Sequence, residues 1–249
     1  MEEIERHRFG LIGRNISYSF SKGYFSKKFE KLGLSGHSYE NFDLSDIKEF
    51  EKLRTKKHIK GLNVTIPYKQ SVIPYLDAVD PMAKAIGAVN TIRYSNEGLL
   101  GYNTDAIGFK NSLTPLLRSH HKSALLLGTG GASKAVAYVL KELGIAFTHV
   151  SRNPAPGQLS YTQLTDNHLE AFQIIINCSP VGTFPKILDK PELPYSHLNE
   201  NHLLYDLIYN PLETAFLKEG RTRGAITQNG LPMLELQAEA AWSIWNMPT

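Results

Sequence analysis

A glycine-rich turn in the middle of the chain is the first candidate for ligand chemistry. The segment LLLGTGGAS places Gly128, Gly130 and Gly131 between an apolar run and a stretch of helical character. A backbone without Cβ atoms can turn tightly there and lets a pyrophosphate approach the free N–H groups of a helix N-terminus. Ser133 stands where the usual fingerprint has glycine or alanine, so the segment is a variant. A plain tight turn is the alternative, but the strand, turn, helix and second strand within about thirty residues favour a dinucleotide.

The end of the second strand indicates which dinucleotide would bind. The segment AFTHVSRN ends in Ser151, Arg152 and Asn153 and contains no acid. An NAD site places Asp or Glu here to bond the ribose hydroxyls, whereas a cation suits the 2′-phosphate of NADP. A methyltransferase, whose second strand usually ends in an acid, is disfavoured for the same reason. We therefore expect NADP, although without the glycine turn a solvated arginine would be the better interpretation.

Lys69 and Asp105 are the residues that could move a proton. Lys69 ends the segment GLNVTIPYK, and Asp105 lies in YNTDAIGF. Hydride delivery to a carbonyl leaves an alkoxide, and general acid catalysis of that step typically contributes ~10²–10⁴-fold. A lysine beside an aspartate can supply the proton, because the carboxylate orients the ammonium group. Spacing alone leaves open whether the two residues meet, and most lysines are solvated surface charges.

The elements that must position these residues alternate between strands and helices. In the first hundred residues we expect strands at 8–13, 37–44, 59–67 and 88–105, the last with a hairpin turn at SNEG, and helices at 21–33, 47–57 and 68–76. After residue 120 the strand–turn–helix–strand unit is followed by strands at 172–180, 202–209 and 224–230 and by a last helix, LPMLELQAEAAWSIWNM. Continuous apolar runs such as IIIN suit a parallel sheet that is buried on both faces.

These patterns predict an α/β fold class with two α/β domains. The first extends to about residue 106, and a Rossmann-like nucleotide-binding domain follows it. The pattern leaves open which of the two the last helix joins.

Composition excludes several classes of protein. The 249 residues are 42% hydrophobic and carry a formal charge of +3 without a long run of like charges, so no nucleic-acid or polybasic membrane footprint is expected. No apolar stretch approaches the ~18 residues of a membrane span, and the charged N-terminus is not a signal peptide. Cys178 is the only cysteine, which excludes an internal disulfide and favours a reducing compartment, by default the cytoplasm.

Several other residues favour structural roles over chemistry. His120 and His121 are adjacent and would point different ways in a strand or helix; with no metal-binding spacing elsewhere, we predict no metal site. Cys178 is expected to be a buried small residue. Trp242 and Trp245 are expected to pack rather than bind a ligand. Tyr205 and Tyr209 are expected on one face of a strand.

Ordered motifs along most of the chain resemble those of the shikimate dehydrogenase family. They are LIGRNISYSFS, GLNVTIPYK, IGAVNT, YNTDAIGF, GTGGAS, LLYDLIY and QNGLPMLELQ, which run from about residue 11 to residue 237. Each motif is moderately specific, and their shared order makes coincidence very improbable. The resemblance implies NADP-linked reversible reduction of 3-dehydroshikimate to shikimate in aromatic amino-acid biosynthesis, by a monomer or homodimer. It also implies that the last helix returns to the substrate-binding domain, which would comprise 1–106 and 231–249 beside an NADP-binding domain at 107–230.

The resemblance further implies a role for individual residues. Lys69 falls on the catalytic lysine and Asp105, which would also contact substrate, on its partner. The other substrate-binding positions are Ser19, Ser21, Thr65, Asn90, Tyr209 and Gln237, whose hydroxyl and amide groups suit a small ring with one carboxylate and three hydroxyls. The cofactor-binding positions are Gly128, Thr129, Gly130, Gly131, Ala132, Ser133, Ser151, Arg152, Asn153, Leu207 and Gly230. For any one Ser, Thr or Asn, a capping or turn role is the alternative.

The chain departs from the family pattern in two loops. Arg14 and Asn15 replace an asparagine–proline pair, and Phe20 and Lys22 flank Ser21 where many members have lysine and proline. The segment NPAPGQ lacks the second basic residue that many NADP-using members place after the position of Arg152. Two alternatives therefore stay open: a quinate/shikimate dehydrogenase that uses NAD, and a catalytically silent nucleotide-binding regulator. The missing acid disfavours the first, and the retained Lys69 and Asp105 disfavour the second.

Overall fold

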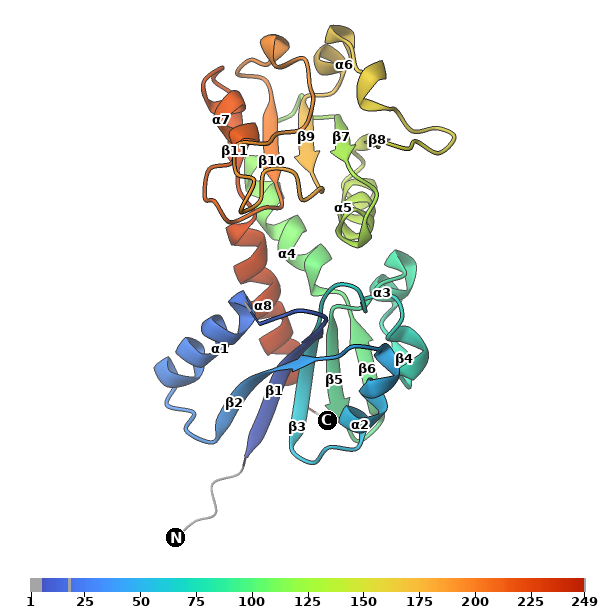
Figure 1. Cartoon of the computed structure of the whole chain (residues 1–249), viewed down its shortest axis with the longest axis vertical. Helices are drawn as coiled ribbons and strands as arrows, with labels where there is room; N and C mark the ends of the chain where they lie inside the picture. Colours follow the sequence, from blue (N-terminus) through green and yellow to red (C-terminus); the bar gives the residue numbers. More distant parts are fainter. Residues whose placement is uncertain (1–5, 18, 249) are drawn as a thin grey trace. The chain divides into compact units, whose positions relative to one another are not determined.

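The computed structural model describes residues 6–17 and 19–248 and has the expected α/β fold class, with two sheets (Figure 1). The chain divides into two compact units, one formed by residues 1–104 with 238–249 and the other by 105–237. In the part of the chain that the structure describes, no helix is both long and apolar enough to cross a membrane.

The first unit contains a mixed six-stranded sheet with strand order β2-β1-β3-β5-β6-β4. β1 pairs in parallel with β2 and β3, whereas β5 is antiparallel to both β3 and β6 and β4 is parallel to β6. The strands are β1 (His7–Gly13), β2 (His37–Asp43), β3 (Ile59–Val64), β4 (Ala78–Val79), β5 (Thr91–Ser95) and β6 (Gly98–Tyr102). The helices are α1 (Phe20–Lys31), α2 (Phe50–Arg54), α3 (Pro81–Ile86) and the end of α8 (Leu231–Trp245).

An aromatic core joins the end of α8 to this sheet. Trp245 packs with Phe9 and Phe25 in one buried cluster, and Trp242 packs against that cluster. Trp245 also donates a hydrogen bond from Nε1 to the Ile92 carbonyl oxygen at 3.0 Å. The expectation that both tryptophans are packing residues is therefore confirmed.

Gly61 is required by this packing. A Cβ atom at Gly61 would lie 2.1 Å from Trp245 Cδ1. We expect Gly61→Ala to lower the free energy of unfolding by about 1–3 kcal/mol, the usual cost of overpacking a core. Gly23→Ala is the matched control, since nothing lies within 4 Å of its added Cβ and alanine favours a helix. Urea unfolding of both variants checks this, and equal stabilities would contradict it.

The second unit contains a five-stranded parallel sheet with strand order β11-β10-β9-β7-β8. Its apolar runs are buried, with Leu125, Leu127 and Ile175 in one core cluster, as the parallel-sheet interpretation required. The strands are β7 (Ser123–Leu127), β8 (Ala146–Val150), β9 (Ile174–Asn177), β10 (Leu203–Asp206) and β11 (Ile226–Gln228). The helices are α4 (Thr104–Leu113), α5 (Gly131–Glu142), α6 (Asp166–Ala171), α7 (Ala215–Arg221) and the first part of α8.

Some predicted elements differ from those observed. The helix expected at 68–76 is a run of turns with a short 3₁₀ helix at Ile73–Tyr75, because Pro74 lacks the N–H that a helix interior needs. The helix expected at 47–57 is a 3₁₀ turn, Ile47–Glu49, followed by the short α2. The strand expected to reach residue 105 ends at Tyr102, and α4 begins at Thr104. The elements that were not predicted are the helices α3, α4, α6 and α7 and the strand β4.

Candidate functional site

A pocket of about 930 Å³ lies in the second unit, beside the carboxyl ends of β7, β8 and β9. This position is typical of ligand sites in open α/β sheets, and the volume is in the range of small-molecule pockets. Of the expected cofactor-binding residues, the pocket is lined by Gly128, Thr129, Gly130, Ser151 and Arg152. Further lining comes from the segments 160–162, 178–181 and 189–192.

The glycine turn leaves room for a ligand beside its backbone. Gly128 has a φ of +111°, a conformation that favours glycine. Nothing lies within 4 Å of a Cβ built on Gly130 or on Gly131. Packing within the protein therefore does not explain glycine at these two positions, and the space beside them is open to a ligand.

The N-terminus of α5 faces the same turn. Gly130 is the N-cap residue, and no side chain caps the helix there. Ser133 is buried, and its hydroxyl donates a hydrogen bond to the Gly130 carbonyl oxygen at 2.7 Å. The uncapped N–H groups of the first turn suit an anion. Ser133 stabilises the turn from within, which explains how this position accepts serine in place of glycine or alanine.

The loop after β8 presents Arg152 to the pocket. The Ser151 hydroxyl accepts a hydrogen bond from the Asn153 N–H at 3.2 Å, and the Ser151 N–H donates to the Leu159 carbonyl oxygen at 2.9 Å. These bonds hold the backbone on both sides of Arg152. Burial raises the pKa of Tyr161, whose ring lines the same pocket, and the positive charge of Arg152 opposes that rise.

A buried network that the sequence analysis missed shapes the wall after β9. The Asn177 side-chain oxygen accepts bonds from the Ser179 N–H at 3.0 Å and the Ser179 hydroxyl at 2.6 Å. Its amide nitrogen donates to the Val181 carbonyl oxygen at 3.2 Å and to Asp206 at 3.1 Å. Asn177 thereby fixes the segment 178–181, which lines the pocket. Cys178 in that segment is partly buried rather than fully buried as expected, and desolvation raises the pKa of its thiol, which suits an inert residue.

Asp206 is the centre of that network. Its carboxylate also accepts bonds from the Ile208 N–H at 3.0 Å and from the Thr214 hydroxyl at 2.6 Å. The residue is fully buried, and this burial raises its pKa to about 6 in spite of the hydrogen bonds that favour the charged form. The available sequence signal was a polar residue closing each of two buried apolar strands, Asn177 on β9 and Asp206 on β10.

Leu207 and Gly230 contact each other. A Cβ on Gly230 would lie 2.1 Å from the Leu207 carbonyl oxygen, so this backbone approach requires glycine. The expected cofactor-binding positions that do not contribute to the described lining of the pocket are Gly131, Ala132, Ser133, Asn153, Leu207 and Gly230.

In the first unit, a buried hydrogen-bond chain leads from Tyr39 to Asn90, one of the expected substrate positions. Ser21 is buried in α1, and the Tyr39 hydroxyl donates to the Asn63 side-chain oxygen at 2.7 Å. The Asn63 amide nitrogen contacts the Thr91 hydroxyl at 3.3 Å, and that hydroxyl donates to the Asn90 side-chain oxygen at 3.1 Å. Asn90 is therefore held in place by the protein itself. The sequence analysis did not identify Tyr39, Asn63 or Thr91 as its supports.

The side-chain amide of Asn90 forms its hydrogen bonds within the protein through its oxygen. Its side-chain oxygen also accepts a bond from the Thr104 N–H at 2.6 Å. None of the hydrogen bonds among the described residues uses its nitrogen, which leaves that donor for a ligand. Ser19 is the N-cap of α1, where its hydroxyl accepts a bond from the Lys22 N–H at 3.4 Å. This is the capping role that stood as its alternative.

Lys69 is partly buried in the turn that follows β3. Its carbonyl oxygen accepts a hydrogen bond from the Val89 N–H at 2.7 Å, and the Thr65 N–H at the start of the turn donates to the Ile12 carbonyl oxygen at 2.8 Å. The turn that carries both Thr65 and Lys69 is thus bonded to the chain on either side. These hydrogen bonds hold the backbone from which the Lys69 side chain projects.

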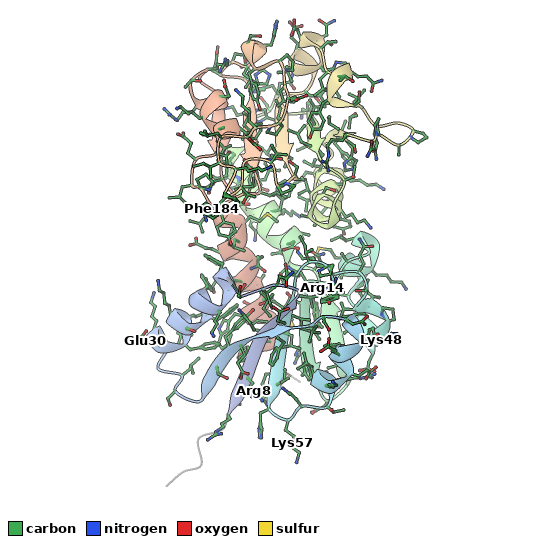
Figure 2. All side chains as sticks on the ribbon, viewed as in Figure 1. Arg8, Arg14, Glu30, Lys48, Lys57 and Phe184 are labelled. Atoms are coloured by element: carbon green, nitrogen blue, oxygen red, sulfur yellow. The ribbon has the colours of Figure 1, made fainter. Side chains whose placement is uncertain are left out.

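Arg14, one of the departures from the family pattern, is tied into the first unit. Arg14, which is labelled in Figure 2, donates from its guanidinium to the Tyr68 hydroxyl at 3.2 Å and to the Ser45 carbonyl oxygen at 2.5 Å. The N–H of the neighbouring Asn15, which has a φ of +57°, donates to Asp43 at 2.9 Å. The loop that contains Arg14 and Asn15 is therefore held by hydrogen bonds of its own.

The remaining expected site residues belong to the second unit. Asp105 is partly buried in the first turn of α4. Gln237 is buried in α8, and its amide nitrogen donates to the Leu234 carbonyl oxygen at 3.0 Å. Tyr209 is exposed and lies beyond β10, which ends at Asp206, so the expectation that Tyr205 and Tyr209 share a strand face is wrong.

The two adjacent histidines also differ from expectation. His120 and His121 lie at a turn rather than in a strand or helix, and the Nε2 atom of each is 3.1 Å from the Asn201 carbonyl oxygen. The expectation that they point different ways is therefore wrong. Across the described residues, no group of three or more His, Cys, Asp or Glu side chains could hold a metal ion.

Known proteins resemble this chain over most of its length. Residues 11–92 match the family model of the shikimate dehydrogenase substrate binding domain. An NADP⁺ shikimate dehydrogenase of Clostridium botulinum is 36% identical over 247 residues, which covers 95% of each chain. The structure of shikimate dehydrogenase from Aquifex aeolicus has a TM-score of 0.87 at 34% identity and covers 100% of this chain and 96% of that one. Shikimate 5-dehydrogenase of Thermus thermophilus, in complex with NADP(H) and shikimate, has a TM-score of 0.85 at 32% identity, with coverages of 96% and 93%.

Proposed function

Because this chain belongs to the shikimate dehydrogenase family, we propose that it catalyses the reversible NADP-dependent reduction of 3-dehydroshikimate to shikimate. The enzyme is then an oxidoreductase that acts on a CH–OH group in aromatic amino-acid biosynthesis. The relative in Clostridium botulinum is named for NADP⁺, and the Thermus thermophilus enzyme was solved with NADP(H) and shikimate.

The proposal that the cofactor is NADP rests mainly on the glycine turn, which has open space beside it and lines the same pocket as Arg152. The space around Gly130 and Gly131 and the uncapped start of α5 fit a pyrophosphate, and Arg152 on the same pocket fits a 2′-phosphate. When bound, NADPH supplies the hydride that adds to the carbonyl carbon. Leu207 and Gly230 are proposed to contact the cofactor through their backbone.

Lys69 is proposed to donate a proton to the carbonyl oxygen as the substrate is reduced. In the reverse direction the same amine accepts the proton from the hydroxyl group of shikimate. Asp105 is proposed as its partner, since a nearby carboxylate favours the charged ammonium and orients it. Proton transfer of this kind typically contributes ~10²–10⁴-fold to the rate.

The substrate is proposed to be held by short neutral side chains. Ser19 and Ser21 are assigned to its carboxylate, and Asn90 donates from the amide nitrogen that the fold leaves unused. The positions assigned to the carboxylate, the ring hydroxyls or both are Thr65, Asn90, Tyr209 and Gln237. A site built from such groups rejects an analogue that lacks a hydroxyl, because a buried polar group then stays unpaired.

The proposed domains are a substrate-binding domain of residues 1–106 with 231–249 and an NADP-binding domain of residues 107–230. The compact units of the structure divide at slightly different positions, after residue 104 and within α8 after residue 237. We also propose that the enzyme acts in the cytoplasm, as a monomer or homodimer, on a small molecule and not on nucleic acid.

We expect Arg152→Gln to raise the KM for NADP by about tenfold or more, because a charge-assisted hydrogen bond to the 2′-phosphate contributes about 1.5–3 kcal/mol. The KM for NAD, which has no 2′-phosphate, should change little. Initial rates of shikimate oxidation with each cofactor measure both values. Arg118→Gln is the control, since Arg118 is outside the lining of the pocket. Equal changes for NADP and NAD would remove Arg152 from 2′-phosphate recognition.

A further inference from the structure

The pocket beside the glycine turn has a second cation that the sequence motifs do not indicate. Lys190 lies far along the chain from Arg152, in the connection between β9 and β10, yet both line the same pocket. Lys190 also lines an adjoining hollow together with Tyr161, the ring on which the charge of Arg152 acts. Lys190 is therefore a basic residue on the lining of this pocket, whereas the segment 153–158 has none.

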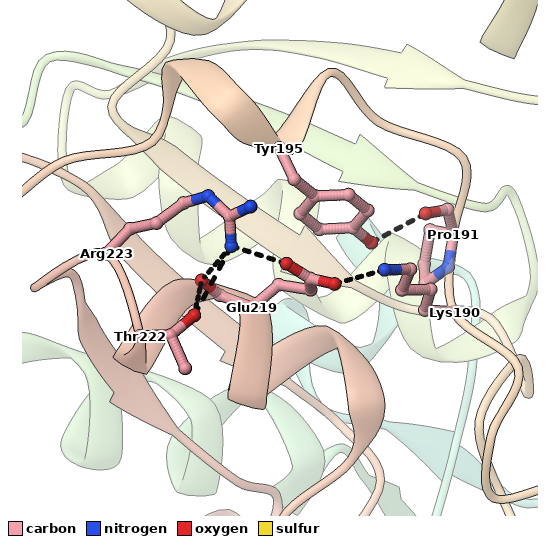
Figure 3. A network of polar contacts seen from close by, with 6 residues as sticks. All are labelled: Lys190, Pro191, Tyr195, Glu219, Thr222 and Arg223. Atoms are coloured by element: carbon pink, nitrogen blue, oxygen red, sulfur yellow. Dashed lines mark hydrogen bonds and ion pairs between the residues drawn. The ribbon is translucent and has the colours of Figure 1, made fainter.

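The Lys190 ammonium is held in place from two sides. It forms an ion pair with Glu219, and its Nζ lies 4.7 Å from the centroid of the Tyr195 ring (Figure 3). The Tyr195 hydroxyl in turn donates to the Pro191 carbonyl oxygen at 2.6 Å, which ties the lysine's own segment to that ring. With 38% of its side chain exposed, Lys190 is positioned but still open to a ligand.

The charge of Lys190 is only partly neutralised by its partner. Glu219 is shared, because Arg223 also bonds to its carboxylate and donates to its carbonyl oxygen at 3.0 Å (Figure 3). The bond from Lys190 lowers the pKa of Glu219, so this carboxylate stays ionised at neutral pH. Lys190 and Arg223 together carry more charge than the single carboxylate of Glu219. Asp189 and Glu192 on the same wall outweigh this excess, so an anion binds here through direct contact with the ammonium group and not through a positive field of the whole wall.

We propose that Lys190 is a specificity-determining residue that binds the 2′-phosphate of NADP together with Arg152. The inference rests on the proposed function, since it assigns a further residue to the cofactor site. Lysine binds phosphate as a point charge, and the phosphate joins Glu219 as a second anion beside the ammonium. Lys190 thereby takes the role of the basic residue that is missing after Arg152.

Binding of 2′,5′-ADP and of 5′-AMP to the full chain tests this without turnover. We expect Lys190→Gln to weaken binding of 2′,5′-ADP by about tenfold in calorimetry and to leave 5′-AMP within about twofold. Lys190→Arg, which keeps the charge, should retain most of the affinity. Lys186→Gln is the control, an exposed lysine of the same connection that does not line the pocket.

The outcomes separate the inference from the function on which it rests. A purely structural role for Lys190 would weaken both nucleotides together, and unchanged 2′,5′-ADP binding in Lys190→Gln would overturn the inference outright. Failure of the unaltered protein to bind 2′,5′-ADP would instead overturn the cofactor assignment. Thermal unfolding of each variant shows whether the fold is intact, and Lys190→Met, which also removes the charge, serves where Lys190→Gln does not fold.

Discussion

Replacing Lys69 with alanine should lower kcat by about 10²–10⁴-fold while shikimate still binds, because the variant lacks the group that moves the proton. Lys69 is partly buried in a turn whose backbone is bonded on both sides, so the side chain projects from a fixed point. A loss confined to the transition state lowers kcat and kcat/KM alike. A loss of binding alone would raise KM and leave kcat unchanged.

Stopped assays over long times measure the residual rate of this variant, and calorimetry measures shikimate binding. Lys84→Ala is the control, because Lys84 is exposed in the last turn of α3. Turnover within about twofold of the unaltered enzyme would remove Lys69 from the chemistry and favour the interpretation as a silent regulator.

The second large effect concerns stability. Asp206→Ala should lower the free energy of unfolding by about 3–5 kcal/mol, since each buried donor left without a partner costs about 1–3 kcal/mol. The carboxylate accepts bonds from Asn177, Thr214 and the Ile208 N–H, all in the buried interior. Asp166→Ala, in an exposed ion pair with His197, should cost less than about 1 kcal/mol. Equal losses in urea unfolding would contradict the assignment.

The same carboxylate predicts a pH dependence of stability. Burial raises the pKa of Asp206 to about 6 from an ordinary value of 3.8, so between these values the folded state holds the proton more tightly than the unfolded state. The contribution of Asp206 to stability is therefore fully present below the unfolded pKa and is lost as pH rises through 6. Relative to Asp206→Asn, the unaltered protein should lose about 2 kcal/mol between pH 4.5 and pH 7. A difference that does not change with pH would contradict the raised pKa.

The sequence predicted those features whose cause is local. The strand, glycine turn, helix and second strand of the nucleotide-binding unit follow from hydrophobic periodicity and from glycine, and all are observed at β7, α5 and β8. The apolar run IIIN predicted a strand buried in a parallel sheet, and β9 is that strand. The glycine turn was predicted to let a pyrophosphate approach the backbone. Nothing lies within 4 Å of a Cβ built on Gly130 or Gly131.

Features that depend on distant parts of the chain were not predictable from pattern. Asp206 joins Asn177 and Thr214 only after β9, β10 and α7 have come together. Lys190 reaches the pocket from a connection without secondary-structure periodicity, so nothing in its neighbourhood distinguishes it from a solvated lysine. The helix predicted at 68–76 does not form. Pro74 and the backbone hydrogen bond between Val89 and Lys69 outweigh the weak helix propensity of this segment.

The most direct test of the proposed dehydrogenase activity is the initial rate of the purified protein with four substrate pairs: shikimate or quinate, each with NADP⁺ or NAD⁺. We expect clear activity with shikimate and NADP⁺, and much lower activity with the other three pairs. Higher rates with quinate or with NAD⁺ would assign the chain to the quinate/shikimate branch of the family. Absence of activity with all four pairs would contradict the catalytic function itself.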